Sequence, residues 1–152
     1  ISYCKTWGIK YRIFRLGNVY GKSDGKVSAK KNALQYLISK LRNDEEIQLY
    51  HGGDFYRDYI HVSDACGLMR VCMEASEIDD IINISSGKRV KFIDIMNYCK
   101  KKLDSKSVFL PVEPSDFHKI VQVKDMWIDT HKIRELGLEL HYNIWSGLDT
   151  LL

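Results

Sequence analysis

The chain has 152 residues, of which 45% are hydrophobic and 28% are charged, and its formal net charge is +3 at pH 7. A chain of this length corresponds to one domain and can bury about 70% of the surface that it exposes when unfolded. No apolar run approaches the roughly 20 residues that span a bilayer, so we expect a soluble, cytoplasmic protein without a membrane partner. The mild charge permits an anionic ligand and does not favour a nucleic-acid partner.

The cysteine and histidine spacings do not indicate a metal site. The four cysteines lack a Cys-x-x-Cys pair, and the five histidines lack the i, i+4 spacing of metal ligands, so we expect reduced thiols and no metal. The chain opens with Ile-Ser-Tyr-Cys-Lys, without an initiator methionine or a secretory signal. We therefore expect that this start is cut from a longer sequence.

The first half of the chain alternates strand and helix patterns. Residues 9–16 are rich in β-branched and aromatic types and precede a cluster of glycines, which predicts a strand and a loop. Between Ser28 and Asn43, apolar residues recur at helical spacing and predict an amphipathic helix. Residues 47–50 and 59–62 read as short strands, and Ser63 or Asp64 is expected to cap the helix that follows.

The second half continues the same alternation. A short apolar strand is predicted at 81–84 and a helix from Phe92 to Leu103, with a possible strand at 108–110. Residues 114–126 have no clear period and are predicted to form a long loop. Helices at 130–136 and 144–152 complete the chain. Alternating strands and helices favour an α/β fold.

Arg57 begins the strand segment Arg-Asp-Tyr-Ile-His-Val-Ser-Asp, which starts at residue 57. A guanidinium held on a strand is suited to binding a phosphate through paired, charge-assisted hydrogen bonds. The alternative is an ion pair with Asp58 or another nearby acid, because many arginines are structural. The residues alone leave both roles open.

Several short motifs in this order resemble a known family. They are Arg-Leu-Gly-Asn-Val-Tyr-Gly at 15–21, the segment from Arg57 to Asp64, Asn-Ile-Ser-Ser-Gly at 83–87, Asp-Thr-His-Lys at 129–132 with Leu-Gly at 136–137, and Gly-Leu at 147–148. Together they resemble the carboxyl-terminal half of the extended short-chain dehydrogenase/reductases, the NAD-dependent sugar-nucleotide epimerases and dehydratases. The middle segment is especially similar to UDP-galactose 4-epimerases.

The resemblance implies roles for five residues between positions 16 and 57. Asn18 would contact the pyrophosphate or sugar of a nucleotide sugar, and Arg57 would bind its phosphate. Leu16 and Gly17 would border the nicotinamide of the cofactor through backbone atoms, and Tyr50 would line the base pocket. Asn18 can instead be a loop residue that holds its own turn, and Tyr50 can instead belong to the core.

The resemblance also points to a second phosphate contact. Family members often carry a further arginine in a loop after the third helix, but the corresponding stretch from Val112 to Lys119 has no arginine. His118 and Lys119 are the nearest basic substitutes, although solvated loop charges are the ordinary alternative.

The family's catalytic elements are missing from these residues. The glycines do not match the dinucleotide-binding fingerprint. In the family, a catalytic Tyr-x-x-x-Lys pair precedes the strand that contains Arg15, whereas here that spacing occurs only later, at Tyr36–Lys40 and Tyr98–Lys102. We interpret both as accidental, so no catalytic residue is assigned in this chain.

The sequence therefore predicts the carboxyl-terminal, substrate-binding part of an extended Rossmann-type enzyme, an α/β fold of mixed short strands and helices spanning 1–152. Residues 1–20 would contribute a strand to the Rossmann sheet, and the NAD-binding half is expected to lie outside this sequence. The resemblance implies an epimerase or dehydratase that acts by transient hydride transfer, with NAD or NADP as cofactor and a nucleotide-diphosphate sugar as substrate. It also allows a homodimer when the protein is intact. The alternative is a non-catalytic module that binds a nucleotide sugar or a partner.

Overall fold

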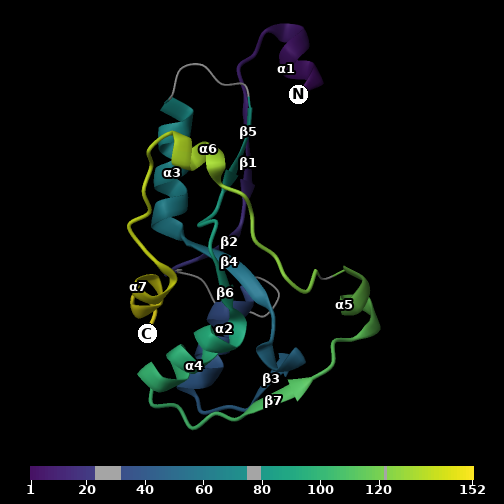
Figure 1. The fold of residues 1–152 in the computed structure, drawn as a ribbon, viewed down its shortest axis with the longest axis vertical. Coiled ribbons are helices and arrows are strands. Elements are labelled where there is room, and N and C mark those ends of the chain that lie inside the picture. The colour runs from purple at the N-terminus through teal and green to yellow at the C-terminus, as the bar shows by residue number, and fades with distance from the viewer. Residues whose placement is uncertain (23–31, 75–79, 122) are drawn as a thin grey trace.

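A computed structural model describes residues 1–22, 32–74, 80–121 and 123–152 (Figure 1). The helices are α1 Ser2–Trp7, α2 Ala33–Arg42, α3 Val62–Glu74, α4 Phe92–Lys102, α5 Asp116–Val121, α6 His131–Glu135 and α7 Ile144–Asp149, with a 3-10 turn η1 at His51–Gly53. The strands are β1 Arg12–Leu16, β2 Asn18–Tyr20, β3 Ile47–Tyr50, β4 Tyr56–His61, β5 Asp80–Ile84, β6 Arg89–Lys91 and β7 Phe109–Val112. None of these helices is long and apolar enough to cross a membrane.

One part of the molecule is built on β1 and β5, which pair in parallel with Arg12 opposite Asp80 and Leu16 opposite Ile84. Helices α3 and α6 lie beside these two strands (Figure 1). A first core cluster joins Ile60, Ala65, Leu68, Cys72, Ile82, Ile84 and Ile133. Ala65, Leu68 and Cys72 on one face of α3 supply most of the helical contribution to this core.

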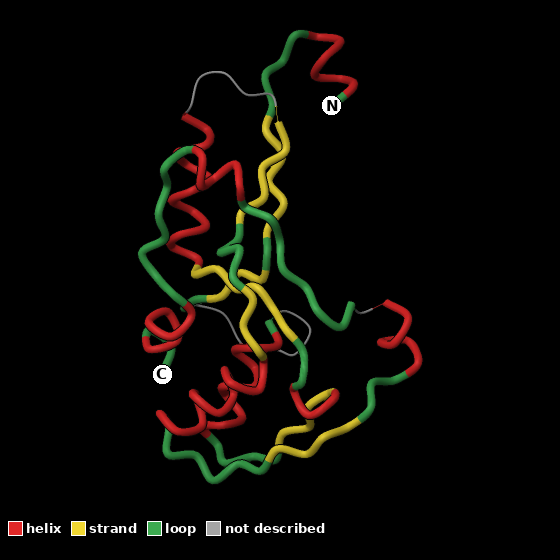
Figure 2. The backbone as a smooth tube through the Cα atoms, in the orientation of Figure 1, coloured by secondary structure: helices red, strands yellow, loops and turns green. Residues whose placement is uncertain are grey.

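The other part contains α2, α4, β3, β7 and α7 (Figures 1 and 2). Strands β3 and β7 pair in parallel, with Ile47 opposite Phe109. A second core cluster joins Tyr20, Leu34, Ile38, Leu41, Ile47, Leu49, Phe92, Ile95, Met96, Cys99 and Leu148. The periodic apolar residues of α2 and α4 face each other here, as amphipathic helices require.

A three-stranded sheet connects the two parts. Its order is β2-β4-β6, with β2 parallel to β4 and β4 antiparallel to β6. Strand β4 is therefore central and carries Arg57 as its second residue. A single bridge from Arg57 to Met126 brings the segment before Ile128 against the start of β4.

Asp58 anchors this central strand. Its side chain is fully buried, and its Oδ1 accepts hydrogen bonds from the backbone and hydroxyl of Ser86, at 3.1 and 2.6 Å. Its Oδ2 accepts from the backbone amides of Gly87 and Ile128, at 3.0 and 3.3 Å. A buried carboxylate is stable only when it is paired in this way. Asp58 thus ties β4 to the end of β5 and to the segment before α6.

Most predicted elements are confirmed, and two expectations are wrong. The predicted helix at Ser28–Asn43 begins at Ala33 behind an Asn32 cap, whereas residues 28–31 lie outside the described residues. The stretch 114–126 is not one long loop, because Asp116–Val121 forms α5. Neither Ser63 nor Asp64 caps α3: both lie inside it, and the amide of Ser63 donates to Nδ1 of His61 at 3.3 Å.

Candidate functional site

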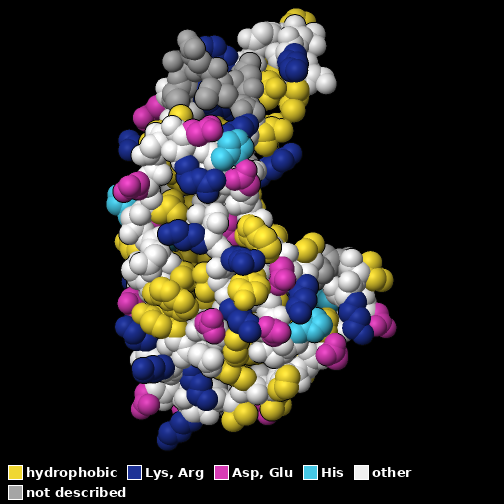
Figure 3. Space-filling model, viewed as in Figure 1, with side chains coloured by type: hydrophobic (Ala, Val, Ile, Leu, Met, Phe, Trp, Pro, Cys, Tyr) yellow, Lys and Arg dark blue, Asp and Glu magenta, His cyan; other side chains and the backbone are white. Residues whose placement is uncertain are grey.

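One cavity of about 650 Å³ collects residues from distant parts of the chain. It is lined by Asn18, Ala33, Tyr36, Leu37, Gln48, Leu49, Tyr50, His51, Phe55, Arg57, Tyr59, Phe92, Pro114, His118, Lys119, Val123 and Lys124. Basic and histidine side chains gather on the surface beside α5 (Figure 3). The lining combines aromatic rings with several cations, and its volume lies within the range of small-molecule sites.

Asn18 is positioned by a strand and not by a turn of its own. It is the first residue of β2, where it lies opposite Tyr59 of β4. Its Nδ2 donates to the backbone carbonyl of Asp58 at 2.8 Å, which fixes the amide at the cavity wall. The alternative of a loop residue holding its own turn is therefore wrong.

Arg57 lies at the same cavity, and its guanidinium is held by backbone carbonyls. Its Nη1 donates to Tyr56 at 2.8 Å and to Lys124, and its Nη2 donates to Val123 at 3.2 Å. The guanidinium also lies 4.5 Å from the centre of the Phe55 ring. Partial burial lowers the pKa of Arg57, yet an arginine stays charged in proteins.

The ion pair considered between Arg57 and Asp58 does not form, because successive strand residues point to opposite faces. Asp58 faces the buried amides, whereas Arg57 and Tyr59 line the cavity. Burial raises the pKa of the Tyr59 hydroxyl, so this group stays neutral at physiological pH. The strand therefore presents one cation and one neutral hydroxyl to the same space.

Tyr50 and His118 meet across the cavity. The Tyr50 hydroxyl lies 3.3 Å from Nδ1 of His118, and the two ring centres are 5.3 Å apart. The Ser115 hydroxyl lies 2.8 Å from the same nitrogen. Lys119 is the next residue of α5 and also lines the cavity. Tyr50 is half-buried and lines the cavity.

Lys124 is a cavity cation that the sequence analysis did not find. It is exposed, lines the cavity beside Arg57 and accepts the Arg57 hydrogen bond at its carbonyl. The segment is fixed because Oδ1 of Asp125 accepts from the amide of Tyr56 at 2.9 Å. A lysine followed by an aspartate in an aperiodic stretch gave no signal by itself. Lys124 is recognised as a cavity residue only because its segment contacts β4 in the folded protein.

Leu16 and Gly17 lie outside this cavity, at the end of β1. The Leu16 side chain is 49% exposed, and the Gly17 amide donates to the carbonyl of Ile84 at 2.9 Å. A Cβ on Gly17 would lie 2.1 Å from the Ser85 hydroxyl oxygen, so this position requires glycine. The missing side chain of Gly17 thus leaves room for the buried Ser85, next to the exposed Leu16.

The two late Tyr-x-x-x-Lys spacings lie inside helices, as expected. The Tyr98 hydroxyl donates to Asp149 at 2.7 Å, and this bond raises the pKa of Tyr98, which is opposite to the need of a catalytic acid/base tyrosine. In the other pair, Nζ of Lys40 lies 3.6 Å from Glu45 instead of beside the Tyr36 hydroxyl, although Tyr36 does line the cavity.

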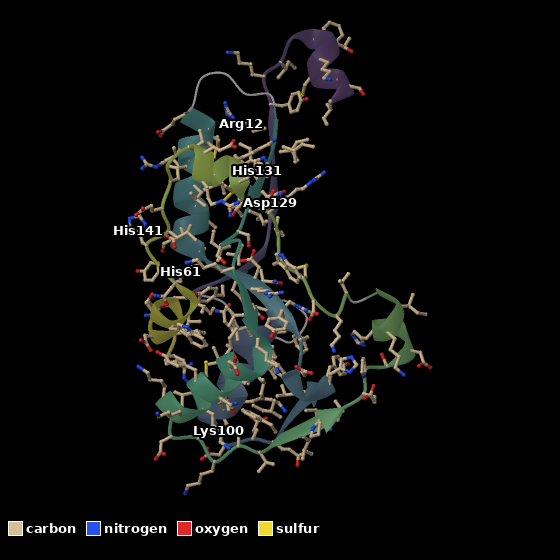
Figure 4. The ribbon with its side chains drawn as sticks, viewed as in Figure 1. Arg12, His61, Lys100, Asp129, His131 and His141 are labelled. Atoms are coloured by element: carbon tan, nitrogen blue, oxygen red, sulfur yellow. The ribbon has the colours of Figure 1, made fainter. Side chains whose placement is uncertain are left out.

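A second acid and base pairing lies away from the cavity. Asp129 and His131 contact each other at 2.7 Å at the start of α6 (Figure 4). Both side chains are more than half exposed, and Arg134 approaches the same carboxylate at 3.5 Å. Within the described ranges, no group of three or more His, Cys, Asp and Glu side chains forms a metal-binding cluster.

Comparison with protein families gives one match. The sequence profile of the NAD dependent epimerase/dehydratase family matches residues 1–85. A dTDP-4-dehydro-6-deoxyglucose reductase of Escherichia coli is 28% identical over 91% of this chain and 42% of its own length. A putative UDP-glucose 4-epimerase of Methanocaldococcus jannaschii is 22% identical over 96% of this chain and 46% of its own length. The chain thus spans less than half the length of these relatives.

Solved structures show the same fold. A UDP-glucose 4-epimerase of Thermotoga maritima, solved with UDP-glucose, superposes with a TM-score of 0.82 at 21% identity, over 99% of this chain and 47% of that chain. A dTDP-glucose 4,6-dehydratase of Streptomyces venezuelae, solved with NAD and TYD bound, gives a TM-score of 0.78 at 21% identity, over 99% and 45% of the two chains. The α/β, Rossmann-type fold predicted from the sequence is confirmed.

Proposed function

The chain belongs to the NAD-dependent epimerase/dehydratase family, and we propose that residues 1–152 are the nucleotide-sugar-binding part of such an enzyme. The NAD-binding part then lies outside this sequence, and β1 joins its sheet. The single observation that carries the proposal is the shared cavity. It brings Asn18, Tyr50, Arg57, His118 and Lys119 together from four separate segments.

Three cations give this cavity the chemistry of a diphosphate site. Arg57, Lys119 and Lys124 all line it, and a guanidinium fork matches a phosphate in two parallel hydrogen bonds. Lys124 takes the place of the second arginine that the sequence analysis sought between Val112 and Lys119. One charge-assisted hydrogen bond typically contributes about 1.5–3 kcal/mol, which corresponds to roughly ten-fold to more than hundred-fold in affinity.

The aromatic residues give the same cavity a place for a nucleobase. Tyr36 of α2, Tyr50 of β3 and His118 of α5 line it. Flat rings with polar tips can stack on a base and hydrogen-bond its edge. Asn18 lies on β2, where its fixed amide can bind the diphosphate or the sugar.

The cofactor fits only the border of this chain. The exposed side chain of Leu16 and the backbone beside it at Gly17 can lie against a flat ring. The glycine-rich fingerprint that holds a dinucleotide is absent from these 152 residues. NAD, or NADP, supplies a reversible hydride acceptor when it is bound.

Calorimetric titration of the protein as its gene encodes it tests the proposal. Arg57→Ala should weaken UDP binding at least ten-fold and leave NAD binding within three-fold, because the proposal places the diphosphate of UDP, and not that of NAD, beside Arg57. Arg134→Ala is the matched control, since Arg134 is exposed on α6 and absent from the cavity lining. Arg57→Lys keeps the charge and removes the fork, and should give an intermediate loss.

Circular dichroism must accompany the titration, because Arg57 also holds the carbonyls of Val123 and Lys124. Equal losses for UDP and NAD would show that Arg57 acts only through the fold. Unchanged UDP affinity in a folded Arg57→Ala protein would remove the diphosphate site from this cavity.

A further inference from the structure

The nucleotide cavity adjoins a second hollow of about 610 Å³. The second hollow is lined by Tyr36, Leu37, Lys40, Glu45, Glu46 and Gln48. Tyr36, Leu37 and Gln48 line both hollows. These three side chains are therefore the place where the two hollows meet, and we call the second one the distal groove.

The periodicity of α2 and β3 makes the two hollows one trough. Along α2, Ala33 faces the first cavity, Tyr36 and Leu37 face both, and Lys40 faces the distal groove. These residues follow the i, i+3, i+4, i+7 spacing of one helix face. The strand beside them runs the opposite way, because Tyr50 lines the first cavity, Gln48 lines both and Glu46 lines the distal groove. A spacing of two residues keeps these side chains on one face.

The trough has a chemical polarity from one end to the other. The cations Arg57, Lys119 and Lys124 line only the first cavity. The distal groove is lined by the carboxylates Glu45 and Glu46 and by Lys40, whose Nζ lies 3.6 Å from Glu45. If the diphosphate lies at the cations, the base lies between Tyr36 and Tyr50 and its outer edge points toward Gln48. The space behind the base then opens into the distal groove.

This opening has a consequence for the size of the base. A purine has a second fused ring that a pyrimidine lacks, and a base site usually rejects it with a closed wall. Here the distal groove is lined by Gln48, Glu45 and Glu46, which carry side-chain oxygens, and by Lys40, which pairs with Glu45 at 3.6 Å. Glutamine and carboxylate side chains pair with the exocyclic amino groups of bases, which adenine and guanine carry. The amide of Gln48 can also turn to offer either an oxygen or a nitrogen.

We propose that the distal groove admits the larger ring of a purine, so that this site takes adenosine and guanosine diphosphates as well as uridine and thymidine diphosphates. The proposal rests on the proposed function, because it uses the diphosphate end of the same cavity. It adds that the nucleobase is not selected by size, and that Gln48 is the residue that contacts the outer edge of either kind of base.

The test is a calorimetric titration of the protein as its gene encodes it with UDP, dTDP, ADP and GDP. Purine diphosphates should bind with dissociation constants within ten-fold of those for the pyrimidine diphosphates. Lys40→Trp should fill the distal groove and weaken ADP and GDP at least ten-fold, with UDP changed less than three-fold, because Lys40 does not line the first cavity. Lys101→Trp, on an exposed position of α4, is the matched control.

Lys40 also contacts Glu45 and the carbonyl of Glu46, so Glu46→Trp serves as a second filling variant if Lys40→Trp fails to fold. Purine diphosphates that bind more than ten-fold more weakly than UDP overturn the inference and leave the proposed function standing. Purine binding that is unchanged in a folded filling variant also overturns it. If none of the four nucleotides binds, the proposed function itself fails, and the inference fails with it.

Discussion

The buried carboxylate of Asp58 allows the sharpest test of how this fold is held. Asp58→Asn keeps the size of the side chain and replaces one oxygen by an amide NH₂. If the remaining oxygen stays on Ser86, the NH₂ group faces the amides of Gly87 and Ile128, which are both hydrogen-bond donors. Two donors without an acceptor, at about 1–3 kcal/mol each, lower the free energy of unfolding by about 2–6 kcal/mol.

That loss is large, because a domain of this kind is stable by only about 5–15 kcal/mol. Urea unfolding followed by far-ultraviolet circular dichroism measures it. Ser86→Ala removes only the 2.6 Å hydroxyl bond to Asp58 and should cost about 1 kcal/mol. Asp116→Asn, on an exposed side chain of α5, should change stability by less than about 0.5 kcal/mol. A loss below about 1 kcal/mol for Asp58→Asn would refute the reasoning, since two buried donors without acceptors should lower the free energy of unfolding by more than that.

Three further outcomes are expected. Burial lowers the pKa of His61, whose Nδ1 accepts from the amide of Ser63. The unfolding free energy should therefore fall by at most about 1.4 kcal/mol per pH unit as the pH drops below about 6.5. His61→Gln should flatten that slope in urea titrations at a series of pH values. Gly147→Ala should lower the unfolding free energy by about 1–3 kcal/mol in thermal melts, because its Cβ would lie 1.9 Å from the Tyr20 hydroxyl. A Cβ on Gly67 would meet nothing within 4 Å, so Gly67→Ala should be neutral or stabilising in the same assay. The 152-residue polypeptide with NAD should not epimerise UDP-glucose above a protein-free control, and any measured turnover would contradict the assignment of the catalytic tyrosine and lysine to a part of the enzyme outside these residues.

Helical periodicity was the most reliable signal in the sequence. The apolar spacing of α2 and α4 predicted both the helices and the faces that they bury, because one stripe of each helix packs on the core. Shorter elements gave no such signal. The six residues of α5 and the three residues of β2 are too few for a period to show. Strand β2 exists because it pairs with β4, about 40 residues later, and such pairing is not local information.

The candidate site shows the same difference between residues that local motifs identify and residues that long-range contacts bring in. The motifs pointed to Asn18 and Arg57, and both residues line the same cavity. Lys124 was missed, because its place depends on two long-range contacts: the carbonyl that accepts from Arg57 and the neighbouring carboxylate of Asp125 that accepts from Tyr56. Residue types mark candidates within a motif, but only the fold shows which distant cation joins them.

The alternation of β4 explains why one short segment serves both fold and site. Arg57 and Tyr59 point into the cavity, and Asp58 between them points into the interior, where four donors hold it. The buried anchor therefore fixes the direction of the cation beside it. A shift of the strand by one residue would exchange their faces, burying the guanidinium and exposing the carboxylate to the ligand. The strong preference for one register follows from the cost of that exchange, because neither group is stable in the place of the other.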